Sequence, residues 1–203
     1  MAFVDSEPRT GQRGGGQPAA DALSVKIVVA GGFGVGKTTL VGAVSEIVPL
    51  RTEALMTEAS TQHDDLSLLP EKTTTTVAMD FGRITLEDDL VLYLFGTPGQ
   101  NRFWFMWDDI SRGAIGAVVL VDTRRLADCF GAIDYFEQRG VPFVIAVNRF
   151  DGRLLHDLGD VREALQLPAQ VPVLDCDARE RGAVKEVLIT LVEYAMSLAG
   201  ATA

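Results

Sequence analysis

The chain has 203 residues, of which 47% are hydrophobic, 23% charged and 7% aromatic; these proportions fit one globular domain and exclude collagen-like, disulfide-stapled and wholly disordered proteins. Its 28 acidic residues outnumber its 18 basic ones and give a formal charge of -10, so we expect no nucleic-acid partner. The apolar stretches are strand-sized, shorter than the ~20 residues of a membrane span, and no secretory or lipidation signature is visible. We therefore expect a cytoplasmic protein without a membrane span, which a partner could recruit to a membrane.

The predicted elements begin after an amino-terminal segment, residues 1–22, whose Gly, Pro, Gln and Arg content and lack of apolar periodicity predict a flexible tail. Residues 23–203 form the predicted domain. In it, short β-branched runs alternate with longer amphipathic stretches, as in sheets built with crossover helices. The predicted strands cover residues 25–30, 77–86, 91–95, 117–122, 143–148 and 171–175. The predicted helices cover residues 37–48, 125–139, 161–165 and 183–198.

The spacing of these elements indicates how the sheet is connected. The link between strands 77–86 and 91–95 is too short for a crossover helix, so this pair is predicted to be an antiparallel hairpin. Three strands, 25–30, 117–122 and 143–148, are apolar without alternation, which is typical of central strands covered on both faces. Residues 49–75 are predicted to be a long functional loop. The fold class is therefore α/β, with a six-stranded, mostly parallel sheet and helices on both faces.

The strongest motif, Gly31-Gly32-Phe33-Gly34-Val35-Gly36-Lys37-Thr38, lies between a predicted strand and a predicted helix and fits the P-loop pattern G-x-x-x-x-G-K-[ST]. Glycines let several main-chain N–H groups turn inward toward phosphates, and the helix amino terminus adds partial positive charge. Lys37 is expected to reach the β- and γ-phosphates, and the Thr38 hydroxyl to bind Mg²⁺. We expect the nucleotide contacts from Gly31, Gly34, Val35, Gly36, Lys37, Thr38 and Thr39.

A second motif, Asn148-Arg149-Phe150-Asp151, follows strand 143–148 and resembles the guanine-reading pattern N-K-x-D with Arg in place of Lys. The two oxygens of Asp151 can accept hydrogen bonds from N1–H and N2–H of guanine, a donor pair that adenine lacks. We therefore expect GTP and GDP as ligands, with Asn148, Arg149 and Asp151 at the base. The alternative is that Asn148 and Asp151 merely cap a turn after the strand.

Together these motifs resemble the small Ras-like GTPases, and in detail the bacterial branch that includes the MglA polarity switch and the GTPases of actinobacterial conservon operons. The resemblance covers residues 25 to about 198 and implies a P-loop NTPase with the small-GTPase arrangement. It also implies a switch-I threonine that binds Mg²⁺ and the γ-phosphate. Thr76 matches this position best, with Thr73, Thr74 and Thr75 as slipped alternatives; all four are also ordinary strand-forming residues.

The resemblance assigns two further signatures. In Gly96-Thr97-Pro98-Gly99-Gln100, the Gly99 N–H is expected to meet the γ-phosphate, and Gln100 to orient the attacking water. The sequence departs from the family here, because Gly96 replaces the acidic residue that usually supports Mg²⁺. Asp122 is a possible substitute, although a helix-capping role is favoured. A weak match to S-A-K, Asp177-Ala178-Arg179, suggests that the Ala178 N–H meets guanine O6.

The predicted function is a Mg²⁺-dependent GTPase that acts as a signalling switch. Phe33 stands where the family carries a small residue, and a ring there would crowd Gln100, so slow intrinsic hydrolysis is expected. The switch regions would bind protein regulators; the resemblance implies a roadblock-type protein and a sensor-kinase-like protein. Two alternatives remain open: a nucleotide-loaded scaffold with negligible turnover, and an ATP-using P-loop enzyme.

Overall fold

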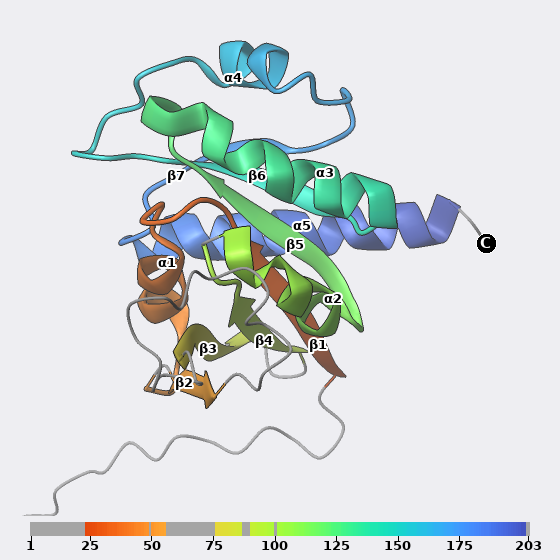
Figure 1. The fold of residues 1–203 in the computed structure, drawn as a ribbon. Coiled ribbons are helices and arrows are strands. Elements are labelled where there is room, and N and C mark those ends of the chain that lie inside the picture. Colours follow the sequence, from red (N-terminus) through yellow and green to blue (C-terminus); the bar gives the residue numbers. More distant parts are fainter. Residues whose placement is uncertain (1–22, 49, 56–75, 87–89, 100, 202–203) are drawn as a thin grey trace, which may run out of the picture.

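The computed structural model describes residues 23–48, 50–55, 76–86, 90–99 and 101–201, and the predicted tail, residues 1–22, lies outside these ranges (Figure 1). The strands are β1 (Leu23–Ala30), β2 (Leu50–Leu55), β3 (Thr76–Leu86), β4 (Leu90–Gly96), β5 (Ala114–Val121), β6 (Phe143–Asn148) and β7 (Val173–Cys176). The α-helices are α1 (Lys37–Val44), α2 (Trp107–Ser111), α3 (Phe130–Arg139), α4 (Leu158–Ala164) and α5 (Arg181–Ala201). Two 3-10 segments, η3 (Asn101–Met106) and η4 (Thr123–Cys129), precede α2 and α3.

All of the strands belong to one sheet, in the order β2-β3-β4-β1-β5-β6-β7. The five strands from β4 to β7 in this order run parallel, whereas β3 is antiparallel to β4 and β2 is antiparallel to β3. The predicted α/β class, the antiparallel hairpin and the six predicted strands are confirmed. Within the described ranges, no helix combines the length and hydropathy that crossing a bilayer requires.

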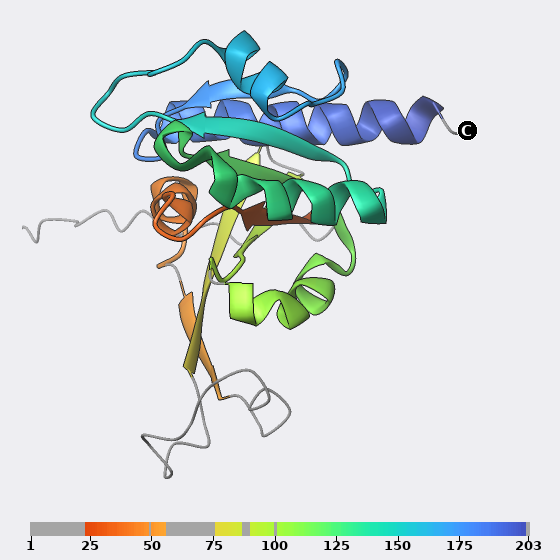
Figure 2. The same cartoon turned by 45° about the horizontal axis from the view of Figure 1, so that its top comes forward.

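Strand β2 is a seventh strand, inside the segment that was predicted to be a loop. It pairs along β3, from Leu50 opposite Phe81 to Leu55 opposite Thr76. Figure 2 shows β2 and the adjoining part of β3 extending away from the rest of the molecule. A short edge strand of this kind, with the sequence Leu-Arg-Thr-Glu-Ala-Leu, depends on its neighbour for pairing and carries little local signal of its own.

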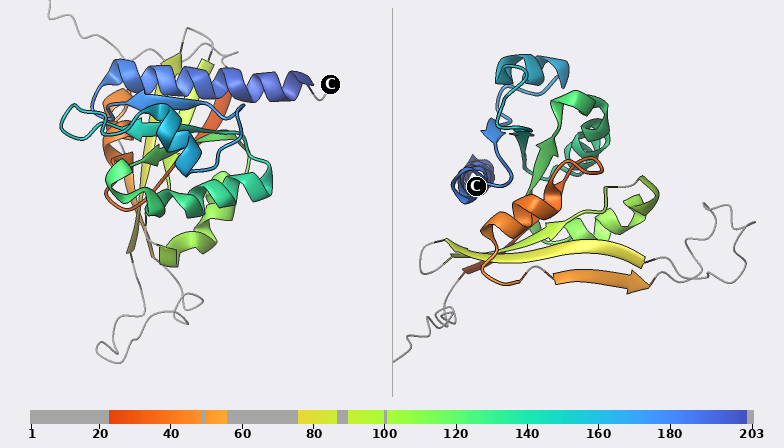
Figure 3. Two further views of the ribbon diagram at one scale, coloured as in Figure 1. Left: turned by 90° about the horizontal axis from the view of Figure 1, so that it is seen from above. Right: turned by 90° about the vertical axis from the view of Figure 1, so that its left-hand side faces the viewer.

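The core consists of two apolar layers, one on each face of the sheet. Figure 3 shows the helices that cover these two faces. Helices α1 and α5 cover one face, where side chains such as Leu40 and Leu188 pack on Ile27, Val118 and Val144. Helices α2, α3 and α4 cover the other, through side chains such as Trp107, Phe136 and Val161. Successive residues of β1, β5 and β6 point alternately into these two layers, which explains their unbroken apolar sequences.

Candidate functional site

The phosphate loop connects the carboxyl end of β1 to the first turn of α1. Gly31, Gly34 and Gly36 all have positive φ angles, of 134°, 73° and 110°, a conformation that other residues adopt only under strain. A Cβ atom on Gly36 would also lie 2.8 Å from the side-chain nitrogen of Asn148. The predicted strand-loop-helix context of the P-loop motif is therefore confirmed, and its glycines are required by the backbone.

Lys37, the first residue of α1, points its ammonium group back over this loop. Nζ donates to the carbonyl oxygens of Gly31 and Gly32, at 2.8 and 2.7 Å. The side chain is buried, with 8% exposed, and burial lowers the pKa of Lys37 to about 8, an effect that the negative charge of Asp80 partly opposes. A cation held in this way at the mouth of a glycine loop and a helix amino terminus can bind a polyphosphate.

The Thr38 hydroxyl donates to Oδ2 of Asp80, at 2.6 Å. Asp80 lies on β3, directly opposite Gly96 on β4. A Cβ on Gly96 would lie 3.1 Å from the Cβ and 3.2 Å from Oδ2 of Asp80, so the space that a side chain at position 96 would need is taken by this carboxylate. The cross-strand neighbour of Gly96 therefore places a carboxylate beside Thr38.

Asp80 is the functional candidate that the sequence reasoning missed. The Asp80 carboxylate and the Thr38 hydroxyl that donates to it are hard oxygen ligands of the kind that Mg²⁺ prefers, so the residues at this point fit the predicted ion. The hairpin register could have revealed it, because residue 80 faces residue 96 when strands 77–86 and 91–95 pair closely. Asp122, the substitute considered from the sequence, instead accepts a hydrogen bond from the Arg124 N–H at the start of η4, as a cap does.

Asn148 joins three loops at the carboxyl edge of the sheet. Its Nδ2 donates to the carbonyl of Val35 in the phosphate loop, at 2.9 Å, and its Oδ1 accepts from the Ala178 N–H, at 3.0 Å. The side chain is buried, so both bonds are shielded from water. Asn148 therefore fixes the phosphate loop relative to the ends of β6 and β7.

Asp151 follows three residues later and has an exposed side chain and a left-handed backbone, with φ of 59°. Its carboxylate forms no hydrogen bond with any other described residue. The arginine of the motif behaves differently, since Arg149 forms a bidentate ion pair with Asp175 on β7. The structure therefore brings Asn148, Arg149 and Asp151 to one end of the site and leaves the Asp151 oxygens available as acceptors.

The loop after β7 differs from the expectation. The Ala178 N–H already has an acceptor in Asn148, and the Arg179 N–H donates to Oδ1 of Asp177, so neither amide is free for guanine O6. Asp177 is buried and forms a bidentate pair with the Arg179 guanidinium, which lowers the pKa of Asp177 to about 2.

Other predicted site residues are placed only in part. Gln100 lies outside the described residues, and so do Thr73, Thr74 and Thr75. Thr76 begins β3, and Thr39 is an exposed residue in the first turn of α1. Gly99 lies against the phosphate loop, because a Cβ there would be 2.7 Å from Nζ of Lys37 and 2.9 Å from Cα of Phe33.

The aromatic segment after Gln100, from Phe103 to Trp107, lies partly in the core and partly on the surface. Trp107 is buried and stacks on the half-buried Trp104, with ring centroids 5.1 Å apart. Phe105, in contrast, is 56% exposed, and Phe33 in the phosphate loop is 65% exposed. A cavity of about 450 Å³ lies between the phosphate loop, Trp104 and the start of α3.

The fold is similar to that of known G domains. The G domain of the FeoB iron transporter from T. maritima matches with a TM-score of 0.60 and 19% identity, over 85% of this chain and 99% of that one. The FeoB G domain of Methanococcus jannaschii matches with a TM-score of 0.56 and 15% identity, over 85% and 98%. In sequence, the chain is 33% identical to the uncharacterized protein MJ1339 of Methanocaldococcus jannaschii, over 63% of this chain and 71% of that protein.

The phosphate loop, the sheet order and these likenesses define the class of protein: a P-loop NTPase with the G-domain fold. Identities below 20% establish the fold alone. The chain belongs to the family described as conserved hypothetical ATP binding protein, whose model matches residues 29–198.

Proposed function

We propose that the protein is a guanine-nucleotide switch, a GTPase that binds GTP and GDP with Mg²⁺ and hydrolyses GTP slowly. The observation that carries this proposal is the position of Asp151. Its carboxylate is exposed, is not hydrogen bonded to other described residues, and follows a buried Asn148 that is bonded directly to the phosphate loop. A carboxylate held there can accept both donors of a guanine edge, whereas adenine offers no such pair.

At the other end of the site, five groups would act on the phosphates or on the metal ion. The loop amides and the Lys37 ammonium would bind phosphate oxygens, and Thr38 with Asp80 would hold the metal ion. Bound Mg²⁺ would neutralise charge on the phosphates. The Gly99 amide, which lies next to Lys37 and Phe33, would meet the γ-phosphate.

Hydrolysis would proceed by attack of water on the γ-phosphorus, with Gln100 orienting the water. We expect the intrinsic rate to be low because Phe33 occupies the loop position beside Gly99 and would crowd Gln100. A partner that supplies an arginine could raise the rate by ~10³ to 10⁵.

We further propose that the protein is a switch of the MglA-like and conservon type. It would work in the cytoplasm with a roadblock-type protein and a sensor-kinase-like protein. The exposed ring of Phe105, beside the half-buried Trp104, gives the segment after Gln100 a surface suited to such contacts. Release of the γ-phosphate would change the contacts of Gly99 and thereby this segment.

The substitution Asp151→Asn tests the base assignment. It should weaken GTP binding by about 100-fold, because the acceptor loses its charge and one of its two hydrogen bonds, and its Nδ2–H would face the N2–H donor of guanine. It should favour xanthosine triphosphate, whose base carries an acceptor oxygen at that position. Equilibrium titration with GTP, ATP and xanthosine triphosphate measures this. Asp160→Asn, at an exposed position of α4, is the matched control. Unchanged GTP affinity in Asp151→Asn would remove the basis of the guanine assignment.

An ATP-using enzyme is the second candidate, favoured by the description of the family as ATP binding. It requires Asp151 to be a bystander. Denaturing the purified protein and identifying the released nucleotide by chromatography separates the two: GDP or GTP supports the proposal, and ADP or ATP supports the alternative. Single-turnover hydrolysis of GTP, with and without cell extract, tests turnover itself. No phosphate release under either condition would indicate a nucleotide-loaded scaffold.

A further inference from the structure

The turn that follows β5 contains a buried acid and two successive arginines, Arg124 and Arg125, which the site described above does not use. Asp122 is 5% exposed, and its carboxylate binds Arg124 side-on: Nε donates to Oδ1 and Nη2 to Oδ2, both at 2.9 Å. The Arg124 N–H adds a third bond to Oδ1, at 3.0 Å. These bonds lower the pKa of Asp122 despite its burial, so the pair stays charged. The guanidinium of Arg124 is thus held in one orientation.

Arg124 reaches the base end of the site. Its guanidinium carbon lies 3.7 Å from the ring centroid of Phe150, the residue immediately before Asp151. Phe150 also forms an isolated bridge with Arg153, which closes the turn around Asp151. A guanidinium stacked on this ring restricts the loop that carries Asp151, whose left-handed backbone is costly for a residue other than glycine.

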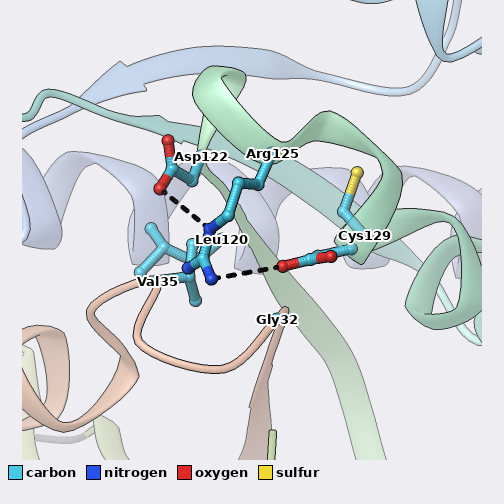
Figure 4. A pocket seen from close by; sticks show the side chains of 7 residues that line it. Gly32, Val35, Leu120, Asp122, Arg125 and Cys129 are labelled. Carbon is cyan, nitrogen blue, oxygen red and sulfur yellow. Dashed lines mark ion pairs between the residues drawn. The ribbon is translucent and has the colours of Figure 1, made fainter.

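Arg125 reaches the phosphate end. Its Nη2 donates to the carbonyl oxygen of Phe33, at 2.7 Å, while its other nitrogens lie 3.8 Å from Asp122 and 3.7 Å from Asp128. Figure 4 shows Arg125 beside Asp122, above the phosphate loop. In a planar trans peptide, C=O and N–H point in opposite directions. Because Arg125 binds the Phe33 carbonyl, the Gly34 N–H of the same peptide points away from Arg125.

The backbone explains how adjacent arginines serve opposite ends of the site. Arg125 interrupts η4 with φ of -140° and ψ of 54°, which are not helical angles. Its side chain therefore leaves the turn in a different direction from that of Arg124. The buried carboxylate of Asp122 pairs with both side chains, Arg124 and Arg125.

We infer that Asp122, Arg124 and Arg125 form a brace that positions both ends of the nucleotide site: Arg124 sets the loop of Asp151 and thus base selectivity, and Arg125 sets the Gly34 amide and thus phosphate affinity. This inference rests on the proposed function for the identity of the base. Both arginines act through other residues, so they are positioning residues.

The brace predicts different effects for two similar substitutions. Arg124→Met should lower the preference for GTP over ATP about tenfold and leave ATP affinity nearly unchanged, because only the guanine contact depends on Asp151. Arg125→Met should weaken GTP and ATP alike, by about tenfold, with the preference unchanged. Equilibrium titration of the full chain with each nucleotide gives both quantities.

Arg139→Met is the matched control. Arg139 also stacks on a ring, 3.9 Å from the centroid of Tyr135, and pairs with Asp108, but it lies on α3 away from the nucleotide motifs. This variant should change neither quantity. A general loss of stability would instead lower the affinities of all three variants for both nucleotides. Thermal unfolding without nucleotide would detect such a loss. If Arg124→Met does not fold, Phe150→Leu tests the same contact from the other side.

Two results would overturn the brace. One is an unchanged GTP preference in both Arg124→Met and Phe150→Leu; the other is an Arg125→Met variant that binds both nucleotides normally. Failure of the proposed function is separate, because it shows in the unsubstituted protein as a lack of preference for GTP.

Discussion

At the scale of single residues, Lys37 carries the clearest electrostatic consequence. Its ammonium is buried among loop carbonyls, and its pKa of about 8 is well below the ordinary value of 10.5. Below about pH 8, the folded protein therefore holds a desolvated charge at a cost of roughly 3 kcal/mol. Between about pH 8 and pH 10.5 the unfolded chain binds more protons at this position, so the contribution of Lys37 to stability rises with pH.

Nucleotide affinity should change with pH in the opposite direction to stability. The phosphates require the charged ammonium, so affinity for GDP should fall as the pH rises from 7 to about 9, through the pKa of about 8, and binding above that value should take up a proton. Titrations at a series of pH values measure the slope. Lys37→Arg, which stays charged throughout, should bind more weakly but with a flat profile. An equally steep profile in Lys37→Arg would assign the titration to another group.

Asp80 makes a second prediction at this scale. Asp80→Asn should raise the Mg²⁺ concentration needed for tight GTP binding by about 10- to 100-fold, because the Thr38 hydroxyl loses a charged partner and the ion loses a nearby carboxylate. Titrating Mg²⁺ against nucleotide release measures it.

The register of the hairpin offers a rescue. Residues 80 and 96 face each other, and a Cβ at position 96 meets mainly atoms of the Asp80 side chain. The double substitution Asp80→Gly with Gly96→Asp returns the acid from the other strand and should restore much of the Mg²⁺ affinity. If it restores none, Mg²⁺ binding requires the carboxylate at its place on β3, and a carboxylate on β4 cannot replace it.

At the scale of elements, the packing of η3 against α3 depends on one glycine. A Cβ on Gly131 would lie 2.5 Å from two ring atoms of Trp104, so Gly131→Ala must push this ring away from α3. Because Trp104 stacks on Trp107, the tryptophan fluorescence should shift to longer wavelength, and we expect a loss of stability of about 1 kcal/mol.

Gly182→Ala is the control for that substitution. Gly182 is the second residue of α5, as Gly131 is of α3, and a Cβ there would meet nothing within 4 Å. It should leave the fluorescence unchanged and raise stability slightly, since alanine is the better helix former. An unchanged spectrum in Gly131→Ala would mean that Trp104 does not rest on α3 in solution.

Strands β1, β5 and β6 could be predicted because burial on both faces leaves an unbroken apolar sequence, and the phosphate loop because its glycines and its neighbours are contiguous. Asp80 could not be assigned in the same way, because its role arises only when β3 and β4 pair. Helix α1 ends at Val44 rather than at the predicted Val48, where the Glu46 N–H turns to bond the Arg83 carbonyl.

At the scale of the whole molecule, the nucleotide site is assembled from connections that meet at one edge of the sheet. The loops after β1, β5 and β7 supply Gly31 to Gly36, Asp122 and Asp177, and the last residue of β6 is Asn148. The relative positions of these residues exist only in the folded chain. A ligand that binds this arrangement and not the unfolded chain must stabilise the entire fold.

The reactivity of the two cysteines can measure this stabilisation by the ligand. Cys129 and Cys176 are free and buried in opposite apolar layers, and burial raises the pKa of each thiol to about 12. Labelling by a thiol reagent therefore requires opening of the fold. Mg²⁺ and GTP at about 100 times the dissociation constant should slow labelling of both thiols by about 100-fold, since the bound state must first release its ligand.

Ser197→Cys, at an exposed position of α5, should label rapidly with or without nucleotide and controls for direct effects on the reagent. If Cys129 alone were slowed by GTP, the layer that holds α3 would open separately from the layer that holds α5. The nucleotide would then stabilise one face of the sheet instead of the entire domain. Equal protection of both thiols is the outcome expected of a site whose loops arise from strands shared by the two layers.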